Sequence, residues 1–247
     1  MCNKKILLSL ISQELNQFNS QRIKNLKEIV PSSIPILWFG DFEKYCLSPK
    51  KIITVSLNPS DNEFKLNKTG RYQTIHRFPS YNGSLISLYT SYNEYFNKKP
   101  YNKWFKSSFG SVLASFNASH YNDNGFTNTA LHTDIGSPYA TSPSWSGLSP
   151  AVKQILEPRG SATWHNLIRI LEPDVILFSA SNSFQNKISF PQVGKWNAIN
   201  VNAKRPLLVG KFQINKTKFT SVLFQVQGRQ PFLQTSKAEK LKFKNYI

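Results

Sequence analysis

Four short apolar runs constrain this chain more than any other feature of its sequence. They are residues 51–57, 126–132, 174–179 and 219–226, which are rich in β-branched, aliphatic and aromatic residues. Segments with helical character lie near residues 4–30, 85–96, 109–116 and 161–171. Buried strands that alternate with helices form parallel sheets covered on both faces. The sequence therefore predicts an α/β fold, a three-layer sandwich around a central four-stranded parallel sheet.

The organisation of the chain is simple. Its 247 residues contain no internal repeat and no long linker, which predicts one domain over residues 1–247. Residues 4–30 would be an N-terminal helical extension, and the lysine-rich end a basic C-terminal segment. No apolar run has membrane-spanning length, no signal-peptide cleavage site is present, and there are two cysteines, Cys2 and Cys46. We expect a cytoplasmic monomer without a membrane partner or a disulfide framework.

The net charge of +18 predicts a polyanionic partner, and nucleic acid is the first candidate. Residues 203–247 contain ten lysines or arginines against one acid, Glu239. The alternative is that an AT-rich genome has raised the lysine content without a binding role. A membrane surface fits less well, because no strongly apolar face accompanies these basic residues. No glycine-rich phosphate loop or acidic metal cluster accompanies the motifs, and two cysteines cannot hold an iron–sulfur cluster. We therefore expect no metal and no cofactor.

The first apolar run stops abruptly at Asn58-Pro59-Ser60, a polar turn sequence. Open α/β sheets bind ligands at the carboxyl ends of their strands, and the other runs end near His132, Ser179 and Gln227. These ends would share one rim of the sheet. Asn58 is therefore either a site residue or part of a plain turn that ends a strand.

The residues from Ser56 to Ser60 resemble the first motif of the uracil-DNA glycosylase superfamily, in its Asn-Pro version. Residues 67–72 (Asn-Lys-Thr-Gly-Arg-Tyr) are similar to the Thr-Gly-Arg-aromatic stretch of some branches. Further similarity follows in the same order at residues 80–96, 125–131 and 170–179. The resemblance implies a four-stranded parallel sheet and a monofunctional enzyme. Such an enzyme flips a base out of double-stranded DNA and cuts its N-glycosidic bond.

The resemblance and the chemistry together suggest roles for individual residues. Asn58 would hold a water, and Asp61 would assist catalysis, with Asp134 as the other acid beyond a strand end. The remaining candidates would bind the base (Ser60, Tyr72, Phe78, Asn128 and His132) or the DNA (Arg71, Gln227, Arg229 and Gln230). Each also has an ordinary structural explanation. Asp61 is a typical helix cap, Tyr72 and Phe78 could anchor loops in the core, and Asn128 could be a bonded polar residue within a strand.

Ser60 bears on the substrate. The strictly uracil-specific branch has a Tyr at this place, whose ring crowds the 5-position of the pyrimidine. The smaller Ser60 leaves room for a 5-substituent, and the polar loop 133–149 with Trp145 could line a wider pocket. One branch of the family removes glucosylated 5-hydroxymethylcytosine from phage DNA in anti-phage defence. The alternatives are a uracil or mismatch repair glycosylase, and a non-catalytic DNA-binding module, because Gln227 to Pro231 lacks the family's closing His.

Overall fold

The structure is a computed structural model, and it describes residues 3–20, 23, 25–66, 70–121, 125–199, 206–226, 232 and 237–242. The chain divides into two compact units, each built from three separate stretches. Unit 1 comprises Met1–Asp41, Leu57–Tyr101 and Thr133–Ile170, and unit 2 comprises Phe42–Ser56, Asn102–His132 and Leu171–Ile247. The boundary falls just after the first strand, so that Asn58 belongs to unit 1. We describe the two units separately.

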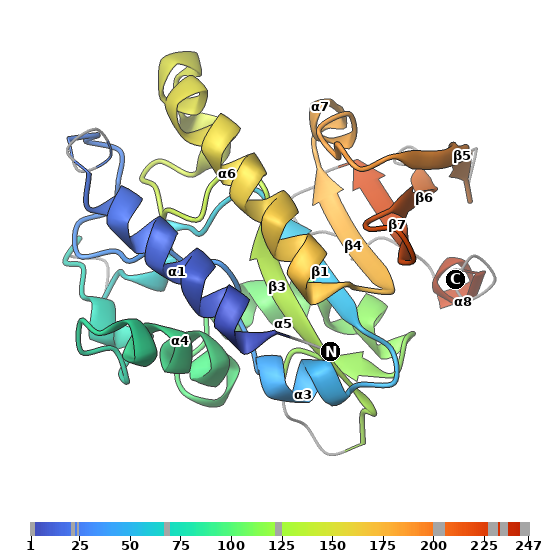
Figure 1. The fold of residues 1–247 in the computed structure, drawn as a ribbon, viewed down its shortest axis with the longest axis horizontal. Helices are drawn as coiled ribbons and strands as arrows, with labels where there is room; N and C mark the ends of the chain where they lie inside the picture. The colour runs from blue at the N-terminus through green and yellow to red at the C-terminus, as the bar shows by residue number, and fades with distance from the viewer. Residues whose placement is uncertain are drawn as a thin grey trace. The chain divides into compact units, whose positions relative to one another are not determined.

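The sheet has seven strands in the order β2-β3-β1-β4-β7-β6-β5 (Figure 1). The pairs β2–β3, β1–β4 and β4–β7 are parallel, whereas β7–β6 and β6–β5 are antiparallel. The strand bounds are β1 (Ile52–Ser56), β2 (Ala118–Ser119), β3 (Asn128–Asp134), β4 (Val175–Ala180), β5 (Gln192–Ala198), β6 (Leu207–Gln213) and β7 (Phe219–Val226). The last two residues of β3 are counted with unit 1.

The four strands expected from the sequence are all present, as β1, β3, β4 and β7, and they are neighbours in the sheet. The prediction of a four-stranded sheet is wrong, because β2, β5 and β6 extend it to seven strands. The missed strands lack a strong pattern. β2 has two residues, β5 is exposed along most of its length, and Gly210 interrupts the apolar residues of β6. A run with little burial gives little hydrophobic periodicity to detect.

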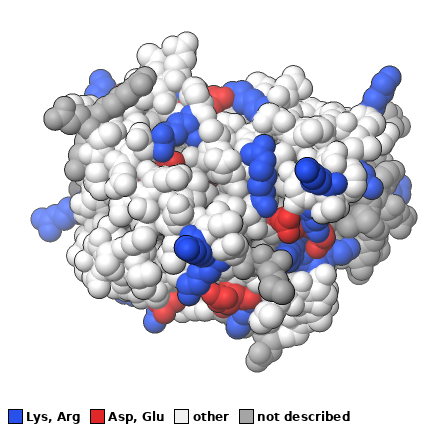
Figure 2. Space-filling model, in the orientation of Figure 1, with Lys and Arg blue, Asp and Glu red and all other residues white. Residues whose placement is uncertain are grey.

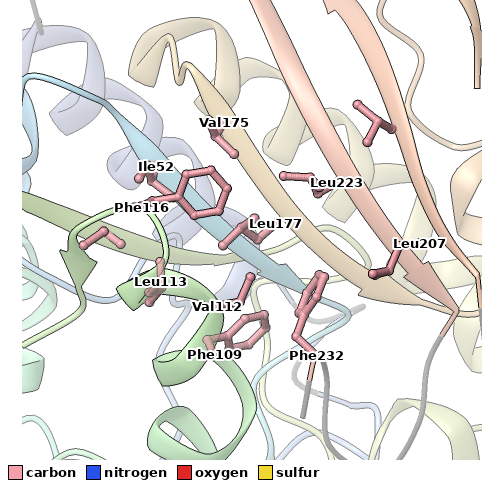
Figure 3. Packing of buried hydrophobic residues seen from close by; sticks show 13 residues of the cluster. Ile52, Phe109, Val112, Leu113, Phe116, Val175, Leu177, Leu207, Leu223 and Phe232 are labelled. Atoms are coloured by element: carbon pink, nitrogen blue, oxygen red, sulfur yellow. The ribbon is translucent and has the colours of Figure 1, made fainter. Parts of the chain in front are cut away.

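In unit 2, helix α5 (Asn102–Ala114) packs on one face of this sheet (Figure 3). Its Phe109, Val112 and Leu113 contribute to an apolar cluster with side chains of β1, β4 and β7, among them Ile52 and Leu177. Successive strand residues point to opposite faces, so residues two apart share a face. The α5 face is therefore apolar at Ile52, Val175 and Leu223, and it continues with Thr54, Ser179 and Gln225 toward the carboxyl ends.

Unit 2 also contains three short helices, α3 (Phe42–Leu47), α7 (Asn182–Gln185) and α8 (Lys237–Lys242). Cys46, in α3, is disulfide-bonded in the structure. The sequence predicts no disulfide framework, and one bonded cysteine is a difference from that expectation. The cytoplasmic location stays a prediction. Within the described residues, no helix combines the length and apolar character needed to cross a membrane.

Unit 1 is mainly helical, with α1 (Lys4–Phe18), α4 (Leu85–Glu94) and nearly all of α6 (Pro150–Leu171). It also has the short 3-10 helices η1 (Asp61–Glu63), η2 (Thr74–His76), η3 (Tyr95–Asn97) and η4 (Trp145–Gly147). The helix expected over residues 4–30 ends at Phe18. Conversely, α6 begins eleven residues before the predicted start at residue 161 and contains Pro158. An internal proline costs a helical hydrogen bond and usually marks a helix end, which explains the short prediction.

Candidate active site

The loop that follows β1 is bonded to a second loop of unit 1, residues 136–141. The carbonyl oxygen of Leu57 accepts hydrogen bonds from the backbone N–H groups of Gly136 at 2.7 Å and Ser137 at 3.1 Å. The carbonyl oxygen of Pro59 accepts from Thr141 N–H at 3.4 Å, and Ser60 forms an isolated parallel bridge with Thr141. Asn58 is therefore held from both sides by ordered backbone.

The amide of Asn58 has a fixed orientation. Its Nδ2 donates to Thr141 Oγ1 at 2.8 Å, to Pro59 O at 3.0 Å and to Tyr139 O at 3.4 Å. Thr141 Oγ1 uses its own proton on Pro143 O, so it can only accept from Asn58. Because all three partners are acceptors, the amide cannot be flipped. The half-buried Asn58 therefore presents Oδ1, which has no partner among the described residues, as an oriented acceptor for a water.

A very close backbone approach holds the second loop against α6. A Cβ atom added to Gly160 would lie 2.2 Å from the carbonyl oxygen of Gly136 and 2.7 Å from the Cα of Ser137. A Cβ added to Gly136 would lie 2.6 Å from the carbonyl oxygen of Leu57. Real side chains do not tolerate such distances to backbone atoms, so these contacts require glycine at both positions.

The acids near Asn58 differ in their surroundings. Asp61 begins η1, is partly exposed and forms an ion pair with Lys65 at 3.5 Å, so it has the role of a turn residue. Glu63 and Asp134 are both buried. The pKa of Glu63 is raised to about 7, chiefly by burial; a hydrogen bond from Tyr95 and the charge of Arg77 oppose this rise, and the charge of Asp134 adds to it. Glu63 is therefore an acid whose pKa lies near neutral pH, a property that its place in the sequence does not indicate.

Glu63 should make the stability of the protein depend on pH. Because its pKa is raised from 4.5 to about 7, the folded state holds a proton that the unfolded state releases between these values. The free energy of unfolding should therefore fall as pH rises from 4.5 to about 7, by about 3 kcal/mol from this group. Urea unfolding of the wild type and Glu63→Gln across this range measures the effect. An unchanged difference between the two proteins at pH 5 and pH 7 would contradict the assignment.

The aromatic residues expected to stack on a base lie in different environments. Phe78 is fully buried, and its ring packs among Phe39, Phe64 and Tyr95 at centroid distances of 6.4, 5.6 and 5.5 Å. Its faces are occupied, so the structure gives Phe78 a place in the core and not against a base. Tyr72 is half-buried on a hairpin, where it bridges Lys65, and it has no ring contact with another described residue. Tyr72 remains a candidate for stacking.

Trp145 was expected to line a pocket and Asn128 to bind the base, but the structure gives both residues other surroundings. Trp145 is buried, 5% exposed, with its ring edge beside Gly136, so it supports the loop from within. Asn128 is the first residue of β3, at the opposite end of the strand from Asp134. Its amide bonds Lys50 N–H at 2.9 Å and Phe116 O at 2.9 Å, which ties neighbouring backbone together. The structure therefore contradicts a base-reading role for Asn128.

His132 belongs to a buried polar cluster of unit 2, together with Thr54 and His120. Thr54 Oγ1 lies 2.8 Å from His132 Nδ1 and 2.8 Å from His120 Nε2. A hydroxyl carries one proton, so at least one of the two rings must donate to it. Burial, followed by the charge of His132, lowers the pKa of His120 well below its usual value. With 2% exposure, His132 is an internal residue beneath α5 and not a surface for a base.

The expected DNA-binding residues are mostly beyond what the structure describes. Gln227, Arg229 and Gln230 lie outside the described residues. Arg71 is exposed on the same hairpin as Tyr72, and its carbonyl oxygen accepts from Leu66 N–H at 2.9 Å. Its side chain is accessible for a phosphate contact. Among the described residues, no group of three or more His, Cys, Asp or Glu is arranged to hold a metal ion.

The sequence alone does not indicate a role for Thr141, which bonds the amide of Asn58, or for Glu63, the buried acid beyond it. Thr141 lies 83 positions from Asn58, and nothing in the local sequence connects them. Glu63 follows Pro59 by four residues in an ordinary polar stretch, and only its burial distinguishes it.

A scan of the chain against protein-family models and a search of curated proteins both returned no match.

Proposed function

We propose that this protein is a monofunctional DNA glycosylase of the uracil-DNA glycosylase type, with that superfamily's three-layer fold. Its substrate would be a 5-substituted cytosine such as glucosylated hydroxymethylcytosine in phage DNA, and its product an abasic site. The observation that carries this proposal is the locked amide of Asn58, which leaves Oδ1 as an oriented acceptor two residues beyond the buried strand β1. An acceptor with a fixed direction is suited to placing a water for attack on a sugar carbon.

The surrounding groups suit this reaction. Cleavage of an N-glycosidic bond develops positive charge on the sugar, and negative groups nearby stabilise it. Glu63 lies five residues beyond Asn58, and Asp134 lies two residues before Gly136, which bonds the carbonyl of Leu57. An amide cannot accept a full proton at neutral pH, so Glu63, with its pKa of about 7, would take up the proton of the water. In this scheme Asp61 stabilises the turn and is not the acid that reacts.

The charge of the chain supports a DNA partner, and it is unevenly divided. By sequence, unit 2 has 17 lysines or arginines against 5 acids, whereas unit 1 has 14 against 8. Unit 2 thus has a net charge of +12 and unit 1 of +6. Basic side chains are scattered over the face shown in Figure 2 and are not gathered in one patch there. Lysine and arginine side chains can contact the phosphate backbone, and such contacts give affinity for DNA without reading its sequence.

The excision of bases by the purified protein tests the proposal. Duplexes carrying glucosylated hydroxymethylcytosine, unmodified hydroxymethylcytosine, uracil or a thymine mismatch are incubated with the protein and then treated with alkali. We expect cleavage at the glucosylated base, and cleavage at uracil alone would instead indicate a repair glycosylase. Tight, salt-sensitive DNA binding without cleavage of any duplex would contradict catalysis and favour a non-catalytic module.

The Ser60→Tyr variant tests the choice of substrate. A ring in place of the small side chain should exclude a base with a large 5-substituent and tolerate uracil. We expect the variant to lose activity on the glucosylated duplex by a much larger factor than on uracil, measured as the ratio of kcat/KM values. An equal loss on both duplexes would mean that residue 60 does not contact the 5-position.

A further inference from the structure

A buried glutamate of the N-terminal helix lies at the centre of a hydrogen-bond network in unit 1. Glu14 of α1 is 1% exposed. Its Oε1 accepts from Arg159 Nη2 at 3.0 Å and from Thr163 Oγ1 at 2.7 Å, both on α6. Its Oε2 accepts from the hydroxyl of Tyr139 at 2.9 Å. Both carboxylate oxygens are therefore bonded, and the charge is paired with that of Arg159.

Tyr139 connects this network to the candidate site. Its side chain donates to Glu14, and its backbone carbonyl is one of the three acceptors that fix the amide of Asn58. Burial, followed by the charge of Glu14 and their hydrogen bond, raises the pKa of Tyr139, so its hydroxyl keeps its proton and always donates. The ring of Phe18, at the end of α1, lies 5.3 Å from that of Tyr139. Helix α1 thus holds Tyr139 by a hydrogen bond and by a ring contact.

The energetics of burial explain why this connection should be stiff. A carboxylate without water must keep its partners, because an unpaired buried charge costs several kcal/mol. Glu14 can satisfy Oε2 through Tyr139 only while that side chain stays in place. The neighbouring backbone is held as well, since Ala140 O accepts from Val30 N–H at 3.0 Å and Pro138 O from Ile36 N–H at 2.8 Å. The loop therefore has little freedom to move away from Asn58.

We propose that Glu14 is a positioning residue, which fixes the amide of Asn58 through Tyr139. In this proposal the N-terminal helix helps to position Asn58 and is more than an extension of the domain. The effect on catalysis rests on the proposed function, but the positioning of Asn58 does not. Loss of a bond to Glu14 should lower kcat by about 10- to 100-fold and leave KM within about twofold, because the water and not the DNA is misplaced.

Matched variants of the network separate positioning from general stability. Thr163→Val removes one donor at almost constant shape, and Thr163→Ser keeps it. Tyr139→Phe removes the hydroxyl and keeps the ring, and Glu14→Gln replaces the carboxylate. Glu43→Gln, an exposed glutamate on α3 of unit 2, is the control for loss of a negative charge. Circular dichroism confirms folding, and where Glu14→Gln does not fold, Tyr139→Phe and the Thr163 pair decide the question.

The readout is the pair of side-chain N–H₂ resonances of Asn58 in the free, ¹⁵N-labelled protein, identified by their loss in Asn58→Ala. We expect them to shift or broaden in Thr163→Val, Tyr139→Phe and Glu14→Gln, and to stay unchanged in Thr163→Ser and Glu43→Gln. Unchanged resonances in all folded network variants would overturn the proposal. Shifted resonances in a protein that excises no base would support positioning and reject the glycosylase, so the two failures are distinguishable.

Discussion

Replacement of Asn58 by alanine should lower the rate of base excision by about 10²–10³-fold, the usual cost of losing one preorganised polar group at a reacting centre. The variant removes the oriented Oδ1 and leaves the backbone of the loop bonded through Leu57 and Pro59. DNA binding should be nearly unchanged, because the basic residues are not touched. Single-turnover cleavage of the glucosylated duplex, with DNA affinity measured alongside, checks both expectations.

Asn62→Ala is the matched control for this variant. Asn62 lies four residues further along, in η1, and the bond that it receives from Arg77 Nε at 3.1 Å goes to its backbone carbonyl, which alanine retains. We expect near wild-type excision from it. Equal activity of Asn58→Ala and Asn62→Ala would remove Asn58 from the mechanism, and the proposed function would lose the observation on which it rests.

Gly160→Ala should lower the free energy of unfolding strongly, although it adds only one methyl group. The new Cβ would lie 2.2 Å from the carbonyl oxygen of Gly136, and rigid backbone on both sides leaves no cheap way to relax. Overpacking of this kind costs about 1–3 kcal/mol, and contacts with backbone belong at the upper end. Because the displaced loop also bonds Leu57, next to Asn58, activity should fall even where the variant is folded. Urea unfolding and excision assays below the melting temperature measure the two effects.

Gly110→Ala, on α5, is the same type of substitution, but we expect it to stabilise the protein. No heavy atom lies within 4 Å of a Cβ added there, and the position is exposed within a helix. Alanine at such a site stabilises by about 0.5–1 kcal/mol. If both variants lost stability to the same extent, the close approach of α6 and the loop would not be the cause.

The buried strands were predictable because their apolar runs carry the signal of burial. Residues 174–179 overlap β4 almost completely, and its six residues are all buried. The edges of the sheet could not be predicted in this way. β5 is exposed along most of its length, and it is held by its backbone pairing with β6 and by the ring of Trp196, which contacts Phe212 and Phe224. Backbone hydrogen bonds are nearly independent of sequence, so a strand held chiefly by them leaves little trace in the amino-acid pattern.

The sequence was sufficient to predict Asn58 as a site residue, but it did not indicate the buried acids of the same unit. Asn58 has a local signature, since an abrupt polar turn follows a buried strand. Phe78 and His132 were chosen for their chemical type, but burial excludes them from contact with a base. Conversely, Glu63 and Glu14 looked like ordinary surface acids in the sequence and are buried in the structure. The chemistry of such residues is set by partners far along the chain, and these can be known only from the fold.

The partners of Glu14 are separated from it by 125, 145 and 149 residues along the chain. Contacts of such long range close large loops, and their entropic cost must be met before they contribute to stability. During synthesis, α1 leaves the ribosome long before α6 exists, so its buried carboxylate has no partners for most of translation. The loop that orients Asn58 can therefore be completed only once α6 has been made. A chain that ends before Arg159 would lack both partners of Glu14 on α6, so the network that holds the loop beside Asn58 would be incomplete.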